Sequence, residues 1–380
     1  MLMVLEGRRD TRPNNADDLK ATLDTLMMST PEGILKPVLA AMKSYSMLGF
    51  MGQGSFGYVV KCKKVEDAEE VALKISKVMG YEMSETNEIS MLQKLRQLDS
   101  DAACIIRCYE FFRVCGHVVI VLEKLDITIS DYMDKRDWSP VSVESLKIIM
   151  KDIASACKAL RDVGLIHSDI NPDNVMLVDQ IQRPFRVKLI DFGEAQKSSD
   201  VRRGCMVQTL PYRAPEVILG LQYNEAIDIW SLAMMITNLS IGSTLCPGRN
   251  NYETLRCIME LLGKPPKKML DDGIYTMYFF SRCPKPSDPK NTWTFKCPHK
   301  YEKQLGIKTQ DRRRRFFSSL DEIKQLPMHN VTKQLSADIS ACIELLKKML
   351  HLDPKERINA DEVLLHPFVS DLPQDDHVDI

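Results

Sequence analysis

One short polar stretch, residues 167–177, constrains the fold of this chain more than any other feature. It reads His-Ser-Asp-Ile-Asn-Pro-Asp-Asn-Val-Met-Leu, so that Asp169 and Asn174 stand five positions apart. The stretch follows a segment of helical periodicity whose apolar positions predict one buried stripe: Leu146, Ile149, Ile153, Cys157 and Leu160. An apolar run, residues 187–190, then leads to Asp191, seventeen residues after Asn174. This order predicts a helix, a polar loop and a strand within one largely helical domain.

A glycine-rich stretch, residues 52–57, lies in a different structural context nearer the N-terminus. Three short runs rich in β-forming residues surround it: residues 47–51, 58–60 and 71–75. They predict a small antiparallel sheet, in which the glycines let the backbone approach a phosphate closely. The alternative, a dinucleotide-binding fold, needs a helix directly after the glycines and an acidic residue about 20 positions later. Because β-branched residues follow and the next fixed feature is Lys74, a strand-turn-strand loop is favoured.

Length, charge and cysteine usage bound the class of protein. A chain of 380 residues is expected to form two lobes, because single cores stop growing at roughly 250–300 residues. With 51 basic and 52 acidic residues, the net charge of −1 predicts neither nucleic acid nor an acidic membrane surface as a partner. The eleven cysteines are odd in number and lack a Cys-x-x-Cys pair, so they are interpreted as free thiols in a reducing compartment. We therefore expect an intracellular protein.

Two smaller features leave alternatives open. Cys283, Cys297 and His299 resemble a metal site, but a fourth ligand and zinc-like spacing are missing, so ordinary thiols are favoured. The run Arg312 to Arg315 fits a nuclear-import or docking patch, although a solvated face is favoured. No signal-peptide core forms near the N-terminus, and no apolar run approaches ~20 residues, so no membrane association is expected.

Taken together, these motifs resemble those of protein kinases. In that family a His-Arg-Asp loop supplies the catalytic base, an Asp-Phe-Gly element holds metal, and a Gly-rich loop and a strand Lys hold the nucleotide. Here they correspond to residues 167–177, 191–193 and 52–57 with Lys74, followed by Ala-Pro-Glu at 214–216. Within the kinases, the chain is most similar to the homeodomain-interacting protein kinases, relatives of the dual-specificity tyrosine-regulated kinases. That closer similarity rests on residues 174–179, 212–216 and 219–221 with 225–228.

The resemblance covers about residues 46–368 and implies an α+β, two-lobed protein kinase fold. A small antiparallel β-sheet with one helix would form the N-lobe, residues 46–123. A larger, mainly α-helical C-lobe would span residues 124–368 and contain an insert at about 243–335. Residues 1–45 are expected to be a loosely ordered extension with one weakly amphipathic segment through Leu19, Leu23, Leu26 and Met27. Residues 369–380 would form a short tail.

The same resemblance implies the site. The residues expected to act in catalysis are Asp169, Lys74, Glu88 and Asn171. Those expected to bind the cofactor ATP are Met51, Gly52, Gln53, Gly54, Ser55, Phe56, Gly57, Val59, Ala72, Lys74, Leu122, Glu123 and Leu125. Asn174 and Asp191 would hold Mg²⁺ against the phosphates. Glu88 would pair with Lys74, although it could also be one of several solvated acids near Glu82 and Glu85.

The implied function is an ATP-dependent protein kinase that phosphorylates Ser or Thr of protein substrates. By family resemblance, the substrates would be nuclear regulatory proteins and the protein a monomer in the nucleus or cytoplasm. The alternative is a pseudokinase, a nucleotide-binding or partner-binding module, because Asn171 stands where such kinases carry Lys. Losing one charge at the reacting centre would slow turnover on the order of 10²–10³-fold. A purely structural protein is disfavoured by the number of separate motifs.

Two further expectations concern the segment before residue 216. Ser168 replaces the Arg that would receive an activating phosphate, and Met206 and Leu210 occupy the places of a Tyr and an Arg in the relatives. The segment is therefore expected to be ordered by apolar packing of Met206 and Leu210, not by a phosphate. The alternative is phosphorylation of Thr209, or of the serines at 198–199. A structural ion pair between Glu216 and Arg357 is also expected.

Overall fold

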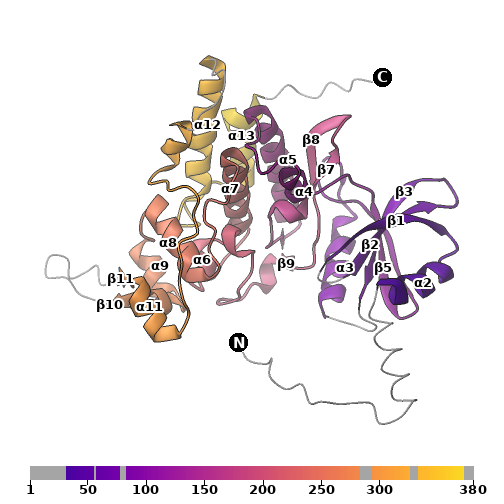
Figure 1. Cartoon of the computed structure of the whole chain (residues 1–380), viewed down its shortest axis with the longest axis horizontal. Helices are drawn as coiled ribbons and strands as arrows, with labels where there is room; N and C mark the ends of the chain where they lie inside the picture. The colour runs from indigo at the N-terminus through magenta and orange to yellow at the C-terminus, as the bar shows by residue number, and fades with distance from the viewer. Residues whose placement is uncertain (1–30, 55–56, 78–82, 283–292, 326–332, 372–380) are drawn as a thin grey trace, which may run out of the picture. The chain divides into compact units, whose positions relative to one another are not determined.

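The computed structural model describes residues 31–54, 57–77, 83–282, 293–325 and 333–371. The chain divides into two compact units. The sheet unit comprises the residues up to Glu85 together with Cys108–Lys124, and the helical unit comprises Thr86–Arg107 and the chain from Leu125 onward (Figure 1). The predicted α+β fold, with an antiparallel sheet and a mainly helical C-terminal part, is confirmed.

The sheet unit contains five antiparallel strands in the order β1-β2-β3-β5-β4. Their bounds are β1 Tyr45–Gln53, β2 Gly57–Lys64, β3 Glu70–Ser76, β4 Cys108–Val114 and β5 His117–Glu123. The core side chains of β2, β3 and β5 are almost fully buried, among them Val60, Leu73 and Val121. These β-branched and apolar residues suit a pleated surface buried on one face, which is why the sequence predicted this sheet.

A helix, α2 (Pro31–Ala41), covers this core. Ile34, Leu35 and Val38 are buried among the strand side chains. The structure therefore differs from the expectation of a loosely ordered segment up to residue 45. Apolar positions at helical spacing find a partner surface, and tertiary packing overrides the low helix propensity of Pro37 within α2. The amphipathic segment expected at residues 19–27 lies outside the described residues.

The helical unit is built around two long buried helices, α5 (Val143–Asp162) and α7 (Ala226–Ile241). Its other helices are α3 (Met83–Leu95, which enters the unit at Thr86), α4 (Ile129–Asp134), α6 (Pro215–Ile218), α8 (Asn251–Leu262), α9 (Lys267–Asp272), α10 (Thr276–Phe279), α11 (Pro298–Leu305), α12 (Lys333–Met349), α13 (Ala360–Leu365) and α14 (Pro367–Ser370). Short 3₁₀ helices lie at Pro172–Asn174, Ser198–Asp200, Leu210–Tyr212 and Leu320–Gln325. The strands form three antiparallel pairs: β6 (Leu165–Ile166) with β9 (Gln196–Lys197), β7 (Val175–Asp179) with β8 (Arg183–Leu189), and β10 (Phe280–Arg282) with β11 (Trp293–Phe295).

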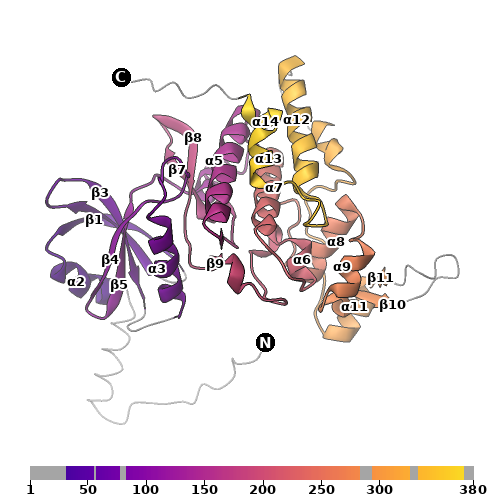
Figure 2. The same cartoon turned by 180° about the vertical axis from the view of Figure 1, so that it is seen from behind.

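The predicted apolar stripe of α5 is confirmed, because each of its five residues is buried. Ser142 caps the helix by accepting a hydrogen bond from the backbone N–H of Ser145. Helices α7, α13 and α14 pack beside α5 (Figure 2). The C-terminal end of α5 leads through β6 into residues 167–177, so this rigid core carries the polar loop.

The expected ion pair between Glu216 and Arg357 is also confirmed. The guanidinium and the carboxylate share two hydrogen bonds of 2.7 and 3.0 Å, and both side chains are completely buried. Arg357 also donates to the carbonyl oxygens of His351 and Ala226, so the buried charge is well satisfied. This pair fastens α6 to the segment before α13.

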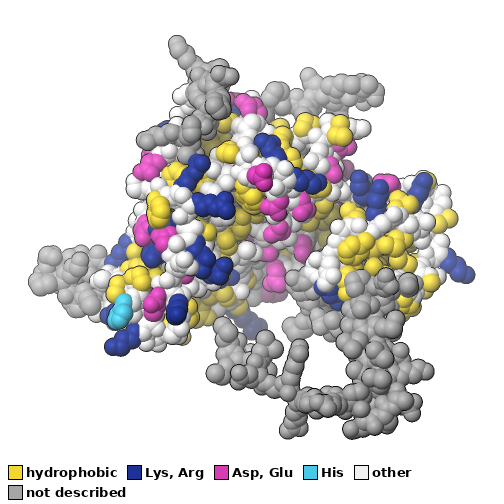
Figure 3. Space-filling model, viewed as in Figure 1, with side chains coloured by type: hydrophobic (Ala, Val, Ile, Leu, Met, Phe, Trp, Pro, Cys, Tyr) yellow, Lys and Arg dark blue, Asp and Glu magenta, His cyan; other side chains and the backbone are white. Residues whose placement is uncertain are grey.

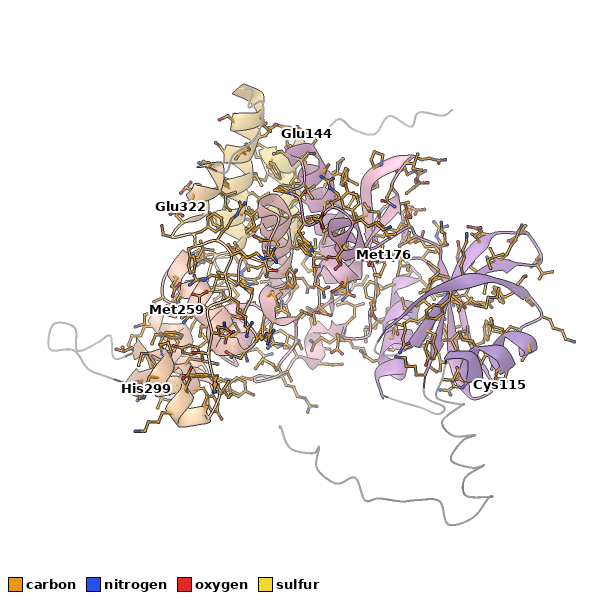
Figure 4. The ribbon with its side chains drawn as sticks, viewed as in Figure 1. Cys115, Glu144, Met176, Met259, His299 and Glu322 are labelled. Carbon is orange, nitrogen blue, oxygen red and sulfur yellow. A yellow bond between two sulfur atoms is a disulfide. The ribbon has the colours of Figure 1, made fainter. Side chains whose placement is uncertain are left out.

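The prediction that all cysteines are free thiols is wrong for one pair. Cys246 and Cys257 form a disulfide between the segment after α7 and α8, with their Cα atoms 5.7 Å apart. Two cysteines eleven positions apart give no recognisable motif, so only the packing of these two segments reveals the pair. Exposed His299 lies on α11 (Figure 4). Cys283 lies outside the described residues, and no group of three potential metal ligands occurs within them.

The basic run at residues 312–315 is not one uniform patch. Arg313 forms ion pairs with Glu260 and Asp311, and only 8% of its side chain is exposed. The other three arginines are exposed. On the face in Figure 3, basic and acidic side chains intersperse over this part of the helical unit. Within the described ranges, no helix has the length and apolar character needed to cross a bilayer.

Candidate active site

Asp169 lies at the centre of a compact hydrogen-bonded loop. The Nδ2 atom of Asn174 donates to the Asp169 carbonyl oxygen at 2.9 Å and to its carboxylate Oδ2 at 3.0 Å. The Nδ2 atom of Asn171 donates to the same carbonyl at 3.0 Å, and the Oδ1 atom of Asn171 accepts from the backbone N–H of Asp173 at 2.9 Å. Two amide side chains thus hold the Asp169 backbone. Because both protons used by Asn174 point at Asp169, its Oδ1 atom is directed away from this contact.

A buried carboxylate on α7 holds the start of the loop. Asp228 accepts hydrogen bonds from the backbone N–H groups of His167 at 2.8 Å and Ser168 at 3.0 Å. Complete burial raises the pKa of Asp228 to about 6, although the His167 charge and both backbone bonds act in the opposite direction. Ser168 has a left-handed backbone with φ of 66°, which costs energy for a residue with a Cβ atom and needs such support.

Asp191 and the two residues after it lie beside this loop. The His167 ring contacts the Phe192 ring edge to face at 5.1 Å and its Nε2 atom lies 3.0 Å from the Ile190 carbonyl oxygen. Asp191 also has a left-handed backbone, with φ of 58°, and its Oδ1 atom accepts from the Gly193 N–H. The structure therefore places Asp169, Asn174 and Asp191 on one framework in the helical unit, since Ile190 N–H donates to the Asn174 carbonyl at 2.9 Å.

Asn87, on α3, fixes the backbone that follows Asp191. Its Nδ2 atom donates to the carbonyl oxygen of Gly193 at 3.1 Å and of Ala195 at 2.7 Å. The two bonds bracket Glu194, whose pKa is raised by partial desolvation and by the negative charges of Asp169 and Asp191. One amide thus ties α3 to the segment that positions Asp191.

Thr209 contacts the carboxylate of Asp169, the predicted catalytic base. Its backbone N–H and its Oγ1 hydroxyl both donate to Asp169 Oδ1, at 3.0 and 2.7 Å. One oxygen of the carboxylate therefore faces the activation segment, residues 194–213, and the other faces Asn174. The pattern shows that Asp169 readily accepts a hydrogen bond from an aliphatic hydroxyl.

The expectation that Met206 and Leu210 order this segment by apolar packing is wrong for Met206. Met206 is 42% exposed, whereas Gln208 is buried with a left-handed backbone (φ of 66°). The Nε2 atom of Gln208 donates to the Ile227 carbonyl and Ser231 Oγ at 2.9 and 2.8 Å. Its Oε1 atom accepts from the Ala214 N–H at 2.9 Å. A fully satisfied buried amide, not apolar contact, holds the segment.

Arg213 completes this polar framework. Its guanidinium donates to the carbonyl oxygens of Val207 and Gln208 and to Asn251 Oδ1, at distances between 2.6 and 3.1 Å. Burial lowers the pKa of Arg213, and the charge of Asp169 acts in the opposite direction. These bonds fix the left-handed turn at Gln208 directly before Thr209.

Ser168, which stands where the general kinase pattern has Arg, has its own partner in the segment. Gln196 Nε2 donates to Ser168 Oγ at 2.8 Å and to Tyr223 Oη at 3.0 Å. Ser168 therefore belongs to a network of neutral hydrogen bonds, at the position where an Arg would otherwise bind a phosphate.

The other predicted residues lie in the sheet unit, apart from Glu88 and Leu125. Lys74 is on β3, between Val59 of β2 and Ile120 of β5 in the ladder. The glycine stretch forms the predicted strand-turn-strand loop, closed by a 2.9 Å bond from Gly54 N–H to the Gly57 carbonyl. The remaining sheet-unit candidates are exposed Met51 and Gln53, half-exposed Gly52, Leu122 and Glu123, and buried Ala72. Ser55 and Phe56 lie outside the described residues.

Glu88 and Leu125 belong to the helical unit, as do the loop residues already placed. Glu88 is buried on α3 and Leu125 is buried after β5. The pairing of Glu88 with Lys74 stays a prediction.

The glycines differ in what the protein itself requires of them. A Cβ atom at Gly57 would lie 2.6 Å from the Ile75 carbonyl oxygen, so close packing of β2 on β3 explains this glycine. A Cβ atom at Gly52 or Gly54 would meet no described atom within 4 Å. Packing therefore gives no reason for these two.

Sequence reasoning missed the supporting roles of Asp228, Gln208 and Asn87. Asp228 carried a signal, because a carboxylate in an otherwise apolar helix must find buried donors. Gln208 and Asn87 carried none, since exposed amides are common in loops and helices and only the fold shows that these two are engaged.

A family model described as the protein kinase domain matches residues 45–369. Homeodomain-interacting protein kinase 1 of Mus musculus is 38% identical over 353 residues, which is 90% of this chain and 29% of that protein. Homeodomain-interacting protein kinase 2 of Mus musculus is 37% identical over 90% of this chain and 29% of that protein. Homeodomain-interacting protein kinase 4 of Homo sapiens is 34% identical over 86% of this chain and 55% of that protein.

Proposed function

This chain belongs to the protein kinase family, and we propose that it transfers the γ-phosphate of ATP to Ser or Thr hydroxyls of protein substrates. The resemblance to the homeodomain-interacting protein kinases seen in the motifs is confirmed. The proposal is carried by the 2.7 Å hydrogen bond from the Thr209 hydroxyl to Asp169 Oδ1. An acceptor Ser or Thr hydroxyl needs the same kind of contact with this carboxylate in order to lose its proton.

The loop around Asp169 supports a role as base and orienting group. Asn171 and Asn174 hold its backbone and Asn174 holds its second oxygen, so the carboxylate is fixed before substrate arrives. Preorganisation of this kind lowers the reorganisation needed in the transition state. Phosphoryl transfer depends mainly on such positioning and on charge neutralisation.

Protein kinases use ATP with Mg²⁺, and the donor set fits that ion. Mg²⁺ prefers oxygen ligands and is commonly held by one or two carboxylates plus substrate phosphates. Asp191 offers a carboxylate, and Asn174 directs its amide oxygen away from Asp169. In this proposal these two residues hold the ion, which neutralises phosphate charge.

The ATP site proposed in the sheet unit rests on Lys74 and the glycine loop. Lys74, paired with Glu88, binds the α- and β-phosphates, and Gly52 and Gly54 let the backbone approach them. The backbone of Glu123 to Leu125 binds the adenine edge. Met51, Val59, Ala72 and Leu122 supply its apolar surroundings.

The second candidate is a pseudokinase, and one observation favours it. Asn171 is buried and uses its amide to brace the loop, so position 171 provides no cation toward a γ-phosphate. Both candidates share the proposed nucleotide site and differ only in turnover.

The deciding experiment is transfer of labelled phosphate from ATP to a generic basic protein. Asp169→Asn serves as the blank, because it keeps the size of the side chain and removes its negative charge. Wild-type signal well above the blank, with label on Ser and Thr after hydrolysis, supports the kinase. Signal equal to the blank supports the pseudokinase, and label on Tyr contradicts the Ser/Thr specificity.

The partners proposed are ATP and protein substrates, with a monomeric chain in the nucleus or the cytoplasm. The chain covers only 29% to 55% of the relatives' lengths. We therefore only propose that it shares substrates with those longer proteins. As their names state, those relatives interact with homeodomain proteins. Binding of a homeodomain protein to this chain in a pull-down with purified components tests the point.

A further inference from the structure

A contact between the insert and the activation segment is not used by the proposed chemistry. Tyr275 lies between α9 and α10 of the insert. Its Oη hydroxyl donates to the Gly204 carbonyl oxygen at 2.8 Å, and its backbone N–H donates to the Leu219 carbonyl oxygen at 3.0 Å. One residue therefore bridges the activation segment and the turn after α6.

Two glycines make room for this contact. Gly204 has φ of 83°, and a Cβ atom there would lie 2.5 Å from Ile274 Cδ1. Gly220 has φ of 69°, and a Cβ atom there would lie 2.5 Å from Tyr275 Cδ2 and 2.6 Å from Ile274 Cγ1. The left-handed backbone favours glycine at both positions, and at Gly220 the close approach of the Tyr275 ring does so as well. The tip formed by Ile274 and Tyr275 is thus seated between two separate segments.

The contact between Tyr275 and Gly204 lies close to the part of the activation segment that contacts Asp169. Gly204 precedes by four residues the buried Gln208, which fixes the turn at Thr209. Gln208 anchors one side of this short stretch and Tyr275 anchors the other. Cys205 and Met206 between them are exposed, so no apolar core of their own holds them.

We propose that Tyr275 is a positioning residue that fastens the activation segment in the place where Thr209 meets Asp169, so that the insert orders the segment without a phosphate. This inference rests on the proposed function, whose substrate site the segment would form. A substrate protein would lie against the segment, whereas ATP would not. Loosening the segment therefore weakens productive binding of the protein substrate and leaves ATP binding unchanged.

The test compares Tyr275→Phe with Tyr278→Phe. The second tyrosine is 46% exposed on the same helical turn, and its hydroxyl makes no hydrogen bond to any described residue. Exposed Arg202 and Arg203 provide trypsin sites directly before Gly204. Limited tryptic cleavage after Arg203 reports order in the segment even if the chain transfers no phosphate.

Tyr275→Phe should speed cleavage after Arg203 about fivefold, as expected for the loss of one neutral hydrogen bond. It should raise KM for the protein substrate by a similar factor and leave KM for ATP at the wild-type value. Tyr278→Phe and phosphatase-treated wild type should behave like untreated wild type. Cleavage of Tyr275→Phe no faster than that of Tyr278→Phe would overturn the proposal. So would phosphatase treatment that accelerates cleavage as much as Tyr275→Phe. Inactive wild type with accelerated cleavage of Tyr275→Phe contradicts the proposed function alone.

Discussion

Replacing Asn171 by Lys tests whether a missing cation limits this kinase. The structure adds a cost that the sequence did not show, because the Asn171 amide makes hydrogen bonds of 3.0 Å to the Asp169 carbonyl and 2.9 Å from the Asp173 N–H. Each bond contributes about 1 kcal/mol to the free energy of unfolding, so losing both lowers that free energy by about 2 kcal/mol at most. The real cost is lower, since the Asp169 carbonyl keeps Asn174 as a donor and exposed Asp173 regains water.

The expected gain in transition-state stabilisation is larger than this cost in folding stability. One preorganised charge at the reacting centre raises turnover on the order of 10²–10³-fold, equivalent to roughly 3–4 kcal/mol of transition-state stabilisation. Asn171→Lys should therefore turn over faster than wild type. KM for ATP should change little, because the added charge acts mainly where charge moves during transfer.

Asn171→Ala is the matched control. It loses the same two hydrogen bonds and adds no charge, so the ratio of kcat between the Lys and Ala variants isolates the cation. We expect a ratio on the order of 10² in saturating ATP and protein substrate, and urea unfolding curves that show both variants destabilised by about 1–2 kcal/mol. A Lys variant no faster than the Ala variant would refute the reasoning and leave another step limiting.

Four further results are expected. Mg-ATP should raise the melting temperature of wild type and of Lys74→Met unequally, with a much smaller rise for the variant, and equal rises would remove Lys74 from the site. Thr209→Glu should abolish transfer by setting a negative charge against Asp169, whereas Thr209→Ser should retain it; an active Glu variant would contradict the contact. Arg357→Met should lower the free energy of unfolding in urea by about 3–5 kcal/mol because it leaves a buried carboxylate unpaired, and a loss below 1 kcal/mol would show that the pair is not needed. Burial raises the pKa of Asp228 to about 6, so the folded state binds more protons than the unfolded state between pH ~4 and ~6. Wild type should therefore lose folding stability as pH rises from ~4 to ~6. This loss should be absent in Asp228→Asn, and identical stability profiles for the two proteins would exclude a raised pKa of Asp228.

The parts of the fold that followed from sequence are those with a repeated physical signal. The stripe of α5 recurs at helical spacing, and all five of its predicted residues are buried. The strands around the glycine loop show runs of β-formers, and they pair in the antiparallel ladder expected. The Glu216–Arg357 pair followed from family motifs, and its geometry confirms it.

Helix α2 shows why a local signal can mislead. Pro31, Gly33 and Pro37 favour a break, yet Pro31 stands at the first position of the helix, where its missing N–H costs nothing. The decisive contribution is burial of Ile34 and Val38 against the sheet. That contribution depends on strands far along the chain, so no window of sequence around residue 31 contains it.

The prediction for the activation segment failed for a different reason. It assumed that a segment without a phosphate must be ordered by apolar contact. Gln208 shows another solution, in which one amide satisfies three groups and leaves none of its own polar atoms unpaired. Hydrogen bonds are directional, so a buried amide fixes a left-handed turn more strictly than an apolar side chain of the same size could. Arg213 is engaged with the backbone of the same turn, so this cation holds the segment's own carbonyl oxygens. Phosphorylation of Thr209 would replace the hydroxyl proton that is donated to Asp169, and the phosphate would repel the carboxylate that the site needs. We therefore expect the polar residues to order the segment without a phosphate on Thr209.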